Sequence, residues 1–342
     1  MNTALYYLLA FAAGTIWGTT FSLARIATEA GYHPIGLSWW QAIGGCVVLL
    51  PWCLWRNEFR KLESQPRSSQ KPRHNPQPRP QPRPQPKPQP TPQLSHMALV
   101  GITGNVIPAT LLFYAAVYVP AGVLAITIAI VPMLTYAVSV ALSLDRFSTR
   151  RVSGVLLGFI AIVLIMLPDS VDVLPDSPVG STLTDSRLWI AAALFAGIFY
   201  TIENIFVDAR VPRGTSMPVL LCGGMLIAAL LLLPLVVLNG AFVKLTVPLN
   251  RAEWSIIAMM FASSIAYLMY LTLIKLAGAV FASMSGYVVT LSGVLWGIVI
   301  FNESHSTLIW IALLLMLLGM GLVTPRKEVP TEKGSATPDG LS

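Results

Sequence analysis

The chain alternates between long apolar segments and short polar ones, and the apolar segments are as long as membrane-spanning helices. A hydrocarbon layer about 30 Å thick is crossed by about 20 residues of α-helix, because each residue advances the helix by about 1.5 Å. Lipid offers no partner for free backbone amides, so we expect helices that satisfy their own hydrogen bonds. We therefore predict ten transmembrane helices, over residues 4–23, 34–55, 97–117, 122–142, 152–168, 188–207, 217–238, 254–274, 279–301 and 307–323.

The composition agrees with a chain that lies mostly in lipid. Hydrophobic residues make up 55% of the 342 positions and charged residues only 11%, whereas a soluble domain carries about 25% charged residues. No Lys or Arg precedes Arg25, and no small-residue cleavage site follows the first apolar segment, so we interpret that segment as a retained helix. The sequence thus predicts an all-α polytopic membrane protein.

The basic residues are distributed unequally between the two sides of the predicted bundle. When the loops alternate between sides, 18 of the 22 Lys and Arg residues fall on the side of both termini. Cytoplasmic loops carry the excess of Lys and Arg, so we predict that both termini are cytoplasmic. The net charge of +7 then reflects orientation and anionic lipid headgroups, and it does not indicate nucleic acid. The four residues on the other side are Arg25, Arg187, Lys244 and Arg251.

A Pro, Gln and Arg tract at residues 57–95 interrupts the apolar pattern. Such a tract favours extended polyproline II and buries no apolar surface, so we interpret it as a cytoplasmic linker. Two readings stay open for it: a tolerated insertion, or a basic segment that binds anionic lipid or a partner. The predicted units are a five-helix repeat at 1–168 that includes this linker, a periplasmic loop at 169–187, a second five-helix repeat at 188–324 and a disordered cytoplasmic tail at 325–342.

The two halves of the chain align weakly with each other. A shift of about 158 residues pairs Asp145 with Glu303, and the first and sixth helices pair Trp17 with Tyr200. Because five is an odd number, a second copy of a five-helix unit enters the membrane from the opposite side. The sequence therefore predicts two inverted five-helix repeats, an architecture in which two halves rock around a central site.

Three features of the sequence occur in the same order in a known family. They are WGTTF from Trp17, YAAVYVPAGVLAITIAIVP from Tyr114, and an acid before an apolar helix at Asp145 and again at Glu303. In these features the chain resembles the EamA-like branch of the drug/metabolite transporter superfamily. The resemblance covers nearly all ten predicted helices. The chain departs from the family where Gln41 stands at a position that is often Arg.

The resemblance implies a transporter of the bacterial inner membrane, which mostly exports amino acids, drugs or related small metabolites. We expect secondary transport by alternating access, with the lipid bilayer and a small-molecule substrate as partners and a proton or another ion as a candidate for coupling. The alternative is a membrane-embedded sensor or scaffold without transport. Monomer and homodimer both stay open.

Glu203 is the strongest candidate for a functional side chain. It lies within a predicted span beside Asn204, and Tyr200 precedes it by one turn. A carboxylate deep in a span is costly unless it has a function or a partner. One reading is a cavity-facing acid that binds a cationic group or exchanges a proton, and the other is an acid at headgroup level that reaches water or pairs with Arg210.

Other polar or aromatic residues within the spans are weaker candidates, and for each of them ordinary packing is the alternative. Trp17 adjoins Gly14 and Gly18, which would let a neighbouring helix approach closely. Pro132 frees a carbonyl near the middle of the membrane and is a candidate hinge or gate. The remaining candidates for substrate contact are Asn105, Tyr114, Tyr267, Tyr270, Ser285 and Tyr287.

Several kinds of chemistry find no support in the sequence. The four histidines share no helix face, and the cysteines at 46, 53 and 222 all fall inside predicted spans, so we expect no metal site and no disulfide framework. No GxxxxGK loop is present, which argues against direct use of ATP. Asp145 and Glu303 precede new helices, where a carboxylate typically caps the first turn. We expect no enzyme and no cofactor.

Overall fold

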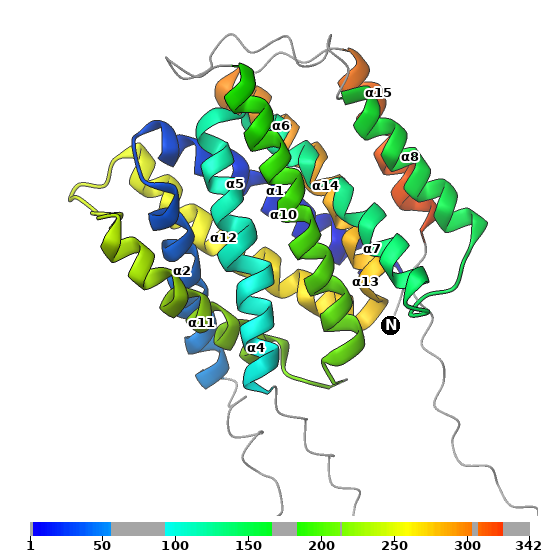
Figure 1. The fold of residues 1–342 in the computed structure, drawn as a ribbon, viewed down its shortest axis with the longest axis horizontal. Coiled ribbons are helices and arrows are strands. Elements are labelled where there is room, and N and C mark those ends of the chain that lie inside the picture. Colours follow the sequence, from blue (N-terminus) through cyan, green and yellow to red (C-terminus); the bar gives the residue numbers. More distant parts are fainter. Residues whose placement is uncertain (1–2, 56–92, 166–182, 213, 303–306, 324–342) are drawn as a thin grey trace, which may run out of the picture.

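In a computed structural model of the chain, the described residues are 3–55, 93–165, 183–212, 214–302 and 307–323, and their regular structure is entirely helical (Figure 1). Short breaks divide several long apolar segments into two or three consecutive helices. The first half contains α1 (Thr3–Glu29), α2 (Pro34–Trp55), α4 (Leu94–Gly101), the π-helical turn η1 (Ile102–Val106), α5 (Ile107–Tyr118), α6 (Ala121–Thr127), α7 (Ile130–Ala141) and α8 (Thr149–Ile165). The second half contains α10 (Leu183–Arg210), α11 (Met217–Leu238), α12 (Arg251–Ala277), α13 (Ala279–Ser283), α14 (Ser285–Phe301) and α15 (Thr307–Leu322).

Within the described ranges, eight helical segments are long and apolar enough to cross a membrane. The two other predicted spans contain α8 and α15, which have 17 and 16 residues and border segments outside the described residues. The prediction of a polytopic all-α protein is confirmed, and the count of ten spans stays a prediction. Most of the linker at 57–95, most of the loop at 169–187, Glu303 and the tail at 325–342 also lie outside the described residues.

Some helices extend beyond the predicted apolar spans. α10 begins at Leu183, inside the segment predicted as a loop, and α1 continues to Glu29. A helix keeps its hydrogen bonds where it leaves the hydrocarbon, so its end is set by local chain geometry and not by the change from apolar to polar residues.

The helix contacts occur in equivalent pairs. When each helix of a contact is replaced by its counterpart from the other half, the result is another contact that the structure contains. α1 packs on α12 as α10 packs on α5, and α1 packs on α14 as α10 packs on α7. α2 packs on α12 as α11 packs on α4. The counterparts α2 and α11 pack on each other, and so do the counterparts α8 and α15. This pattern is what two related five-helix units produce when they pack around a pseudo-two-fold axis.

Two spans are broken in corresponding places, and the breaks face each other. The fourth predicted span breaks between α6 and α7, and the ninth breaks between α13 and α14. Pro132 lies in the first turn of α7, where its missing amide hydrogen is not needed. The Thr290 hydroxyl donates to the Ala125 carbonyl at 2.9 Å, which supplies a partner across the two spans. Pro132 therefore lies just after a break and not within a continuous helix.

Glycines allow several helix pairs to come into backbone contact. A Cβ added at Gly14 would lie 2.6 Å from the Val288 Cβ, and one at Gly18 would lie 2.8 Å from the Val289 carbonyl oxygen, so α1 and α14 are as close as small residues permit. Helix association in lipid depends on such contacts, because lipid is as apolar as the side chains it replaces. The close helix contact predicted beside Trp17 is confirmed.

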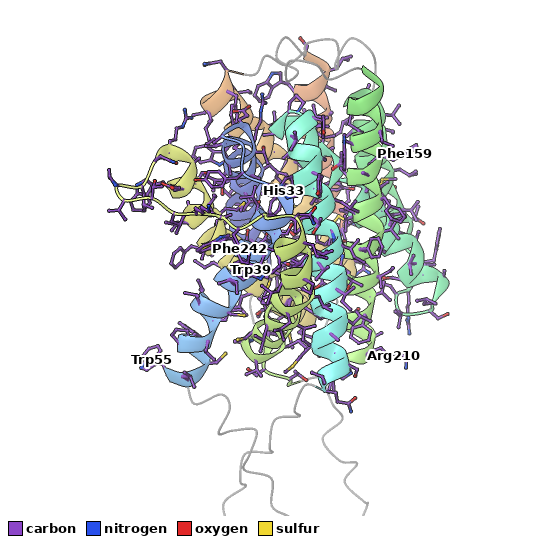
Figure 2. The ribbon with its side chains drawn as sticks, turned by 60° about the vertical axis from the view of Figure 1, so that its left-hand side comes forward. His33, Trp39, Trp55, Phe159, Arg210 and Phe242 are labelled. Atoms are coloured by element: carbon purple, nitrogen blue, oxygen red, sulfur yellow. The ribbon has the colours of Figure 1, made fainter. Side chains whose placement is uncertain are left out.

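The ends of the helices indicate how the bundle is oriented. Trp55 ends α2 and Arg210 ends α10, and both lie at the same end of the bundle in Figure 2, which we name the linker end. The Tyr7 hydroxyl donates to the Val323 carbonyl at 3.3 Å, so the start of α1 lies beside the end of α15. Apolar side chains such as Phe159 project outward along the length of the bundle, as a lipid-facing surface requires.

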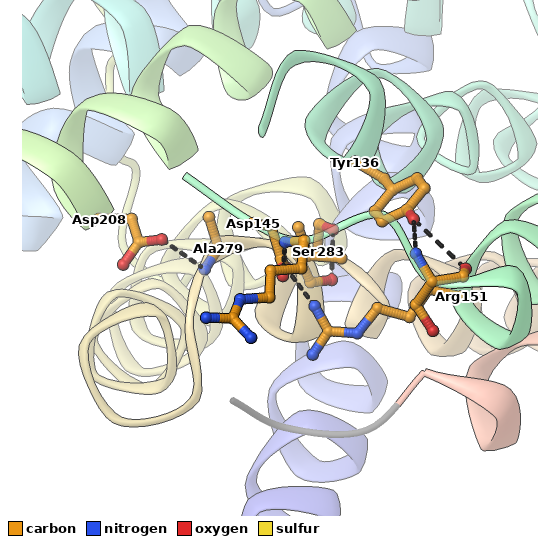
Figure 3. A network of polar contacts seen from close by, with 9 residues as sticks. Tyr136, Asp145, Arg151, Asp208, Ala279 and Ser283 are labelled. Carbon is orange, nitrogen blue, oxygen red and sulfur yellow. Dashed lines mark hydrogen bonds and ion pairs between the residues drawn. The ribbon is translucent and has the colours of Figure 1, made fainter. Parts of the chain in front are cut away.

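A group of polar contacts lies around the start of α8 (Figure 3). Asp145 forms an ion pair with Arg151, which lies in the first turn of α8. The Tyr136 hydroxyl accepts from the Ser148 amide at 3.2 Å, and Ala279 at the start of α13 donates to Asp208 at 3.4 Å. The expected capping role of Asp145 is therefore wrong, because α8 begins at Thr149 and the Asp145 carboxylate is paired with a side chain of that helix.

The contact between α8 and α15 gives a test of backbone packing. A Cβ added at Gly319 would lie 2.5 Å from the Gly154 carbonyl oxygen, whereas one at Gly321 would meet nothing within 4 Å. We expect Gly319→Leu to lower the melting temperature of the purified protein by several degrees, since overpacking costs about 1–3 kcal/mol. Gly321→Leu should leave it near the wild-type value in a thermal unfolding assay in detergent. Equal melting temperatures for the two variants would contradict the close contact.

Candidate functional site

Trp17 of α1 lies at the centre of an aromatic group that joins both halves of the chain. Its ring centroid lies 5.5 Å from Tyr267 and 5.5 Å from Tyr270, both of α12, and 6.2 Å from Tyr200 of α10. The Tyr200 and Tyr270 rings stand nearly perpendicular to the indole, so their edges and faces meet in the arrangement that aromatic quadrupoles favour. Figure 1 shows α1, α10 and α12 at the centre of the bundle. We name Trp17, Tyr200, Tyr267 and Tyr270 the aromatic cluster.

Glu203 lies one turn along α10 from Tyr200, beside this cluster, and its exposed fraction is 0%. The Tyr267 hydroxyl donates to its Oε1, and its Oε2 has no hydrogen-bond partner among the described residues. An ionised carboxylate in such a place costs several kcal/mol unless a cation or several donors compensate it. Glu203 therefore does not reach the protein surface, and its carboxylate bonds to Tyr267 and not to Arg210.

Asn204 connects three helices directly beside Glu203. Its Nδ2 donates to the Thr135 hydroxyl of α7 at 3.2 Å, and its Oδ1 accepts from the Tyr270 hydroxyl of α12 at 2.8 Å. The side chain is fully buried. Both ends of the amide are used, so Asn204 fixes the position of Tyr270 within the aromatic cluster.

A π-helical turn brings a glycine against the acid. Within η1, Gly104 is buried, and a Cβ added there would overlap the Tyr267 hydroxyl and the Glu203 carboxylate. Single π-helical turns inside α-helical spans often occur at functional sites, because the extra residue changes the direction of the side chains that follow. Only glycine leaves room for the Tyr267 and Glu203 pair at this point.

Two small cavities share three of their lining residues, Trp17, Phe21 and Tyr200. The first has a volume of about 40 Å³ and reaches Tyr270, Ser283, Ser285 and Gly286. The second has a volume of about 20 Å³ and reaches Thr20 and Gln41. A water molecule needs about 10–15 Å³ by this measure, so both cavities are narrow in this state. We name the first the serine cavity and the second the glutamine cavity.

The structure brings together six of the sequence-predicted site residues and separates others. The six that share the aromatic cluster or contact it are Trp17, Tyr200, Glu203, Asn204, Tyr267 and Tyr270. Pro132 packs near Gly286, which lines the serine cavity.

Three predicted residues lie elsewhere or only beside the site. Tyr114 stacks on Trp189 at 5.5 Å and contacts His33, so it packs against neighbouring helices. Tyr287 is fully buried and its hydroxyl lies against Gly158 of α8. Asn105 follows Gly104 in the π-helical turn, and its buried amide has no partner among the described residues.

Sequence reasoning missed how several residues contribute. It named Tyr267 as a general candidate but did not predict its bond to Glu203, because the two residues lie 64 positions apart on different helices. Gly104 and Thr135 carried no signal, because a glycine or a threonine in an apolar helix is usually a packing residue. Ser283 could have been found from its place beside the break between α13 and α14.

Comparison with known proteins places the chain in a family. The model of the EamA-like transporter family matches residues 4–167 and 187–324, which together make up most of the sequence. The chain belongs to the EamA-like transporter family. The EamA-like match occurs twice, once in each half, and the family belongs to the drug/metabolite transporter superfamily. The resemblance inferred from the sequence motifs is thereby confirmed, and the EamA-like chain is a multi-pass membrane protein of a transporter family.

A solved structure described as "Crystal structure of protein" resembles this EamA-like chain in fold. The two share 18% sequence identity over 93% of this chain and 96% of the other, with a TM-score of 0.59. No curated protein matches the EamA-like sequence. The structural likeness therefore supports the fold alone.

Two tyrosines allow a matched test of the polar contact at the site. Tyr267→Phe removes the hydroxyl that donates to Glu203, whereas Tyr287→Phe removes a buried hydroxyl that has no partner in the described structure. We expect Tyr267→Phe to destabilise the EamA-like protein by about 1–3 kcal/mol, and Tyr287→Phe to be neutral or stabilising. Denaturant unfolding in detergent measures both. A larger loss for Tyr287→Phe than for Tyr267→Phe would contradict the assigned bond.

Proposed function

We propose that this chain is a secondary transporter that exports a small metabolite or drug by alternating access. The family match supports transport, and the residues of the site support the choice of Glu203 as the group that binds a cationic substrate or exchanges a proton. The observation that carries the proposal is a fully buried carboxylate with one unpartnered oxygen, at a point where α1, α10, α12 and η1 meet.

The proposed mechanism uses the three residues that line both cavities. In it, Trp17, Phe21 and Tyr200 form a wall between the serine cavity and the glutamine cavity, and both cavities are too small for a metabolite. Substrate entry therefore requires α1 and α10 to move apart on one side of the wall at a time. Pro132 is the proposed gate, because the break before α7 lets the two parts of that span move without loss of a helical hydrogen bond at its ring.

The proposed orientation in the membrane rests on the distribution of charge. The chain has ten spans in two inverted repeats, with the linker end and both termini in the cytoplasm and the basic linker near anionic lipid. The membrane is the bacterial inner membrane. The protein works without a cofactor, as a monomer or a homodimer, and the candidate substrates are amino acids, drugs and related small metabolites.

Export from cells gives the first test of transport. We expect cells that produce the chain to release at least one small metabolite faster than control cells, and we expect Glu203→Gln and Trp17→Ala to remove most of that excess. The reason is that both residues lie at the proposed site. Mass spectrometry of the medium, at equal membrane abundance of each variant, measures the release.

The matched control for Trp17→Ala is Trp310→Ala, since Trp310 is 46% exposed on the lipid-facing side of α15. It should retain the excess release. The same metabolite profile in producing and control cells, for every compound measured, would contradict transport and favour the sensor or scaffold reading.

The second test concerns proton coupling. A buried carboxylate without a cationic neighbour is stable as the neutral acid, so release of its proton has to accompany entry of a cation or access of water. In proteoliposomes with an imposed pH gradient, we expect the wild-type flux to rise with the gradient. Flux through Glu203→Gln should not respond to it. An equal response in both proteins would assign the coupling to another residue.

A further inference from the structure

The Ser and Thr hydroxyls at the central site have a common property: they present hydrogen-bond acceptors and not donors. The Ser283 hydroxyl donates to the Val280 carbonyl at 2.8 Å, and the Ser285 hydroxyl donates to the Ala282 carbonyl at 2.8 Å. In the glutamine cavity the Thr20 hydroxyl donates to the Trp17 carbonyl at 2.6 Å. The proton of each hydroxyl is thus directed into its own helix, and only the oxygen lone pairs remain for a ligand.

Two of the three tyrosines at the site follow the same rule. The Tyr267 hydroxyl donates to Glu203 and the Tyr270 hydroxyl donates to Asn204, so neither offers its proton to a ligand. The donors that remain along the two cavities are the Tyr200 hydroxyl, the Trp17 indole and the Gln41 amide, and all three are neutral.

The charges around the site are equally one-sided. Among the described residues that line the two cavities or contact Glu203, none is Lys, Arg or His. Arg25, which follows Ala24 of the glutamine cavity, pairs with Glu29 at 2.7 Å. The Lys275 ammonium of α12 donates to the Val207 carbonyl at 2.6 Å, one turn beyond Glu203. Its charge is therefore directed to the end of α10 and not into either cavity.

The walls of the cavities complete this pattern. Trp17, Tyr200 and Tyr270 surround the serine cavity with aromatic rings, whose faces attract cations through their quadrupoles. The attraction grows when water is excluded. A carboxylate on the substrate meets the opposite situation, because it would lose its hydration and find neither a cation nor a free charged donor.

We propose that the central site selects organic cations that have an apolar or aromatic body and no carboxylate, and that it discriminates against zwitterionic amino acids. This inference rests on the proposed transport function and narrows its substrate range. Gln41 is a determinant of this selectivity. Its side chain lines the glutamine cavity, and an Arg at this position would supply the cation that a substrate carboxylate needs.

The experiment compares two permanently charged compounds that differ by one carboxylate. They are (2-phenylethyl)trimethylammonium and N,N,N-trimethylphenylalanine, and neither crosses a bilayer as a neutral molecule. Flux of each labelled compound is measured in proteoliposomes that contain the full chain, the Glu203→Gln variant or the Gln41→Arg variant, with empty liposomes as the blank. Binding to the same proteins in detergent is measured by tryptophan fluorescence, with Trp17→Phe as the control for the signal.

The wild-type protein should transport the cation at least about tenfold faster than the zwitterion, a ratio that corresponds to about 1.4 kcal/mol. Glu203→Gln should reduce flux of the cation, and Gln41→Arg should reduce the ratio between the two compounds. Rescue of zwitterion flux by Gln41→Arg is a result that a merely structural role of Gln41 would not give.

Three other outcomes overturn different statements. If the zwitterion moves as fast as the cation, and both depend on Glu203, transport stands and the selectivity for cations is wrong. If neither compound binds or moves, while another small molecule shows Glu203-dependent flux, the selectivity is wrong again. If no compound shows flux above empty liposomes in a protein that is folded by its melting curve, the proposed function falls and the inference falls with it.

Discussion

Close approach of helix backbones at glycines is the constraint on which this structure depends. An apolar helix gains little free energy by exchanging contact with lipid for contact with another apolar helix. The helices therefore hold together where small residues permit extensive contact. Gly14 and Gly18 bring α1 to α14, Gly154 brings α8 to α15, and Gly101 brings α4 to α11. These pairs include helices from both halves in each case. The glycines therefore hold the two repeats together, and the aromatic cluster lies between the helices that they position.

The same constraint explains why polar groups can be buried at the centre. Gly104 leaves the space in which the Tyr267 hydroxyl reaches Glu203. Thr135, Asn204 and Tyr270 form a second chain of hydrogen bonds from α7 to α12. The buried amide of Asn105 has no partner among the described residues, and neither does one carboxylate oxygen of Glu203. A site of this kind is prepared to respond to a proton or a cation, because nothing else in the described surroundings neutralises it.

Much of the architecture could be predicted from the sequence, because it follows from the length of apolar segments and the odd number of helices in a repeat. The gathering of Trp17, Tyr200, Glu203 and Asn204 could also be predicted, since the first and sixth helices occupy equivalent places in the two repeats. Tyr114 and Tyr287 could not be placed, because a tyrosine in a span packs against a neighbour or lines a cavity according to helix rotation, which sequence spacing leaves undetermined. The contact between Tyr267 and Glu203 joins two helices of the second half. Its geometry depends on a π-helical turn in the first half, and a single π-helical turn leaves no repeating pattern in the sequence by which it could be predicted.

The π-helical turn also has a consequence for the outer part of the third span. One additional residue in a helix rotates everything beyond it by about 100° around the axis. The side of α5 that carries Tyr114 and Tyr118, and stacks both rings on Trp189, is therefore set by the turn at Ile102–Val106. If that turn tightened into a regular α-helix, Gly104 would rotate away from the acid and the two tyrosines would rotate away from the tryptophan together. A single change in the winding of this helix would thus alter the surroundings of the buried acid and an aromatic contact several turns away at the same time.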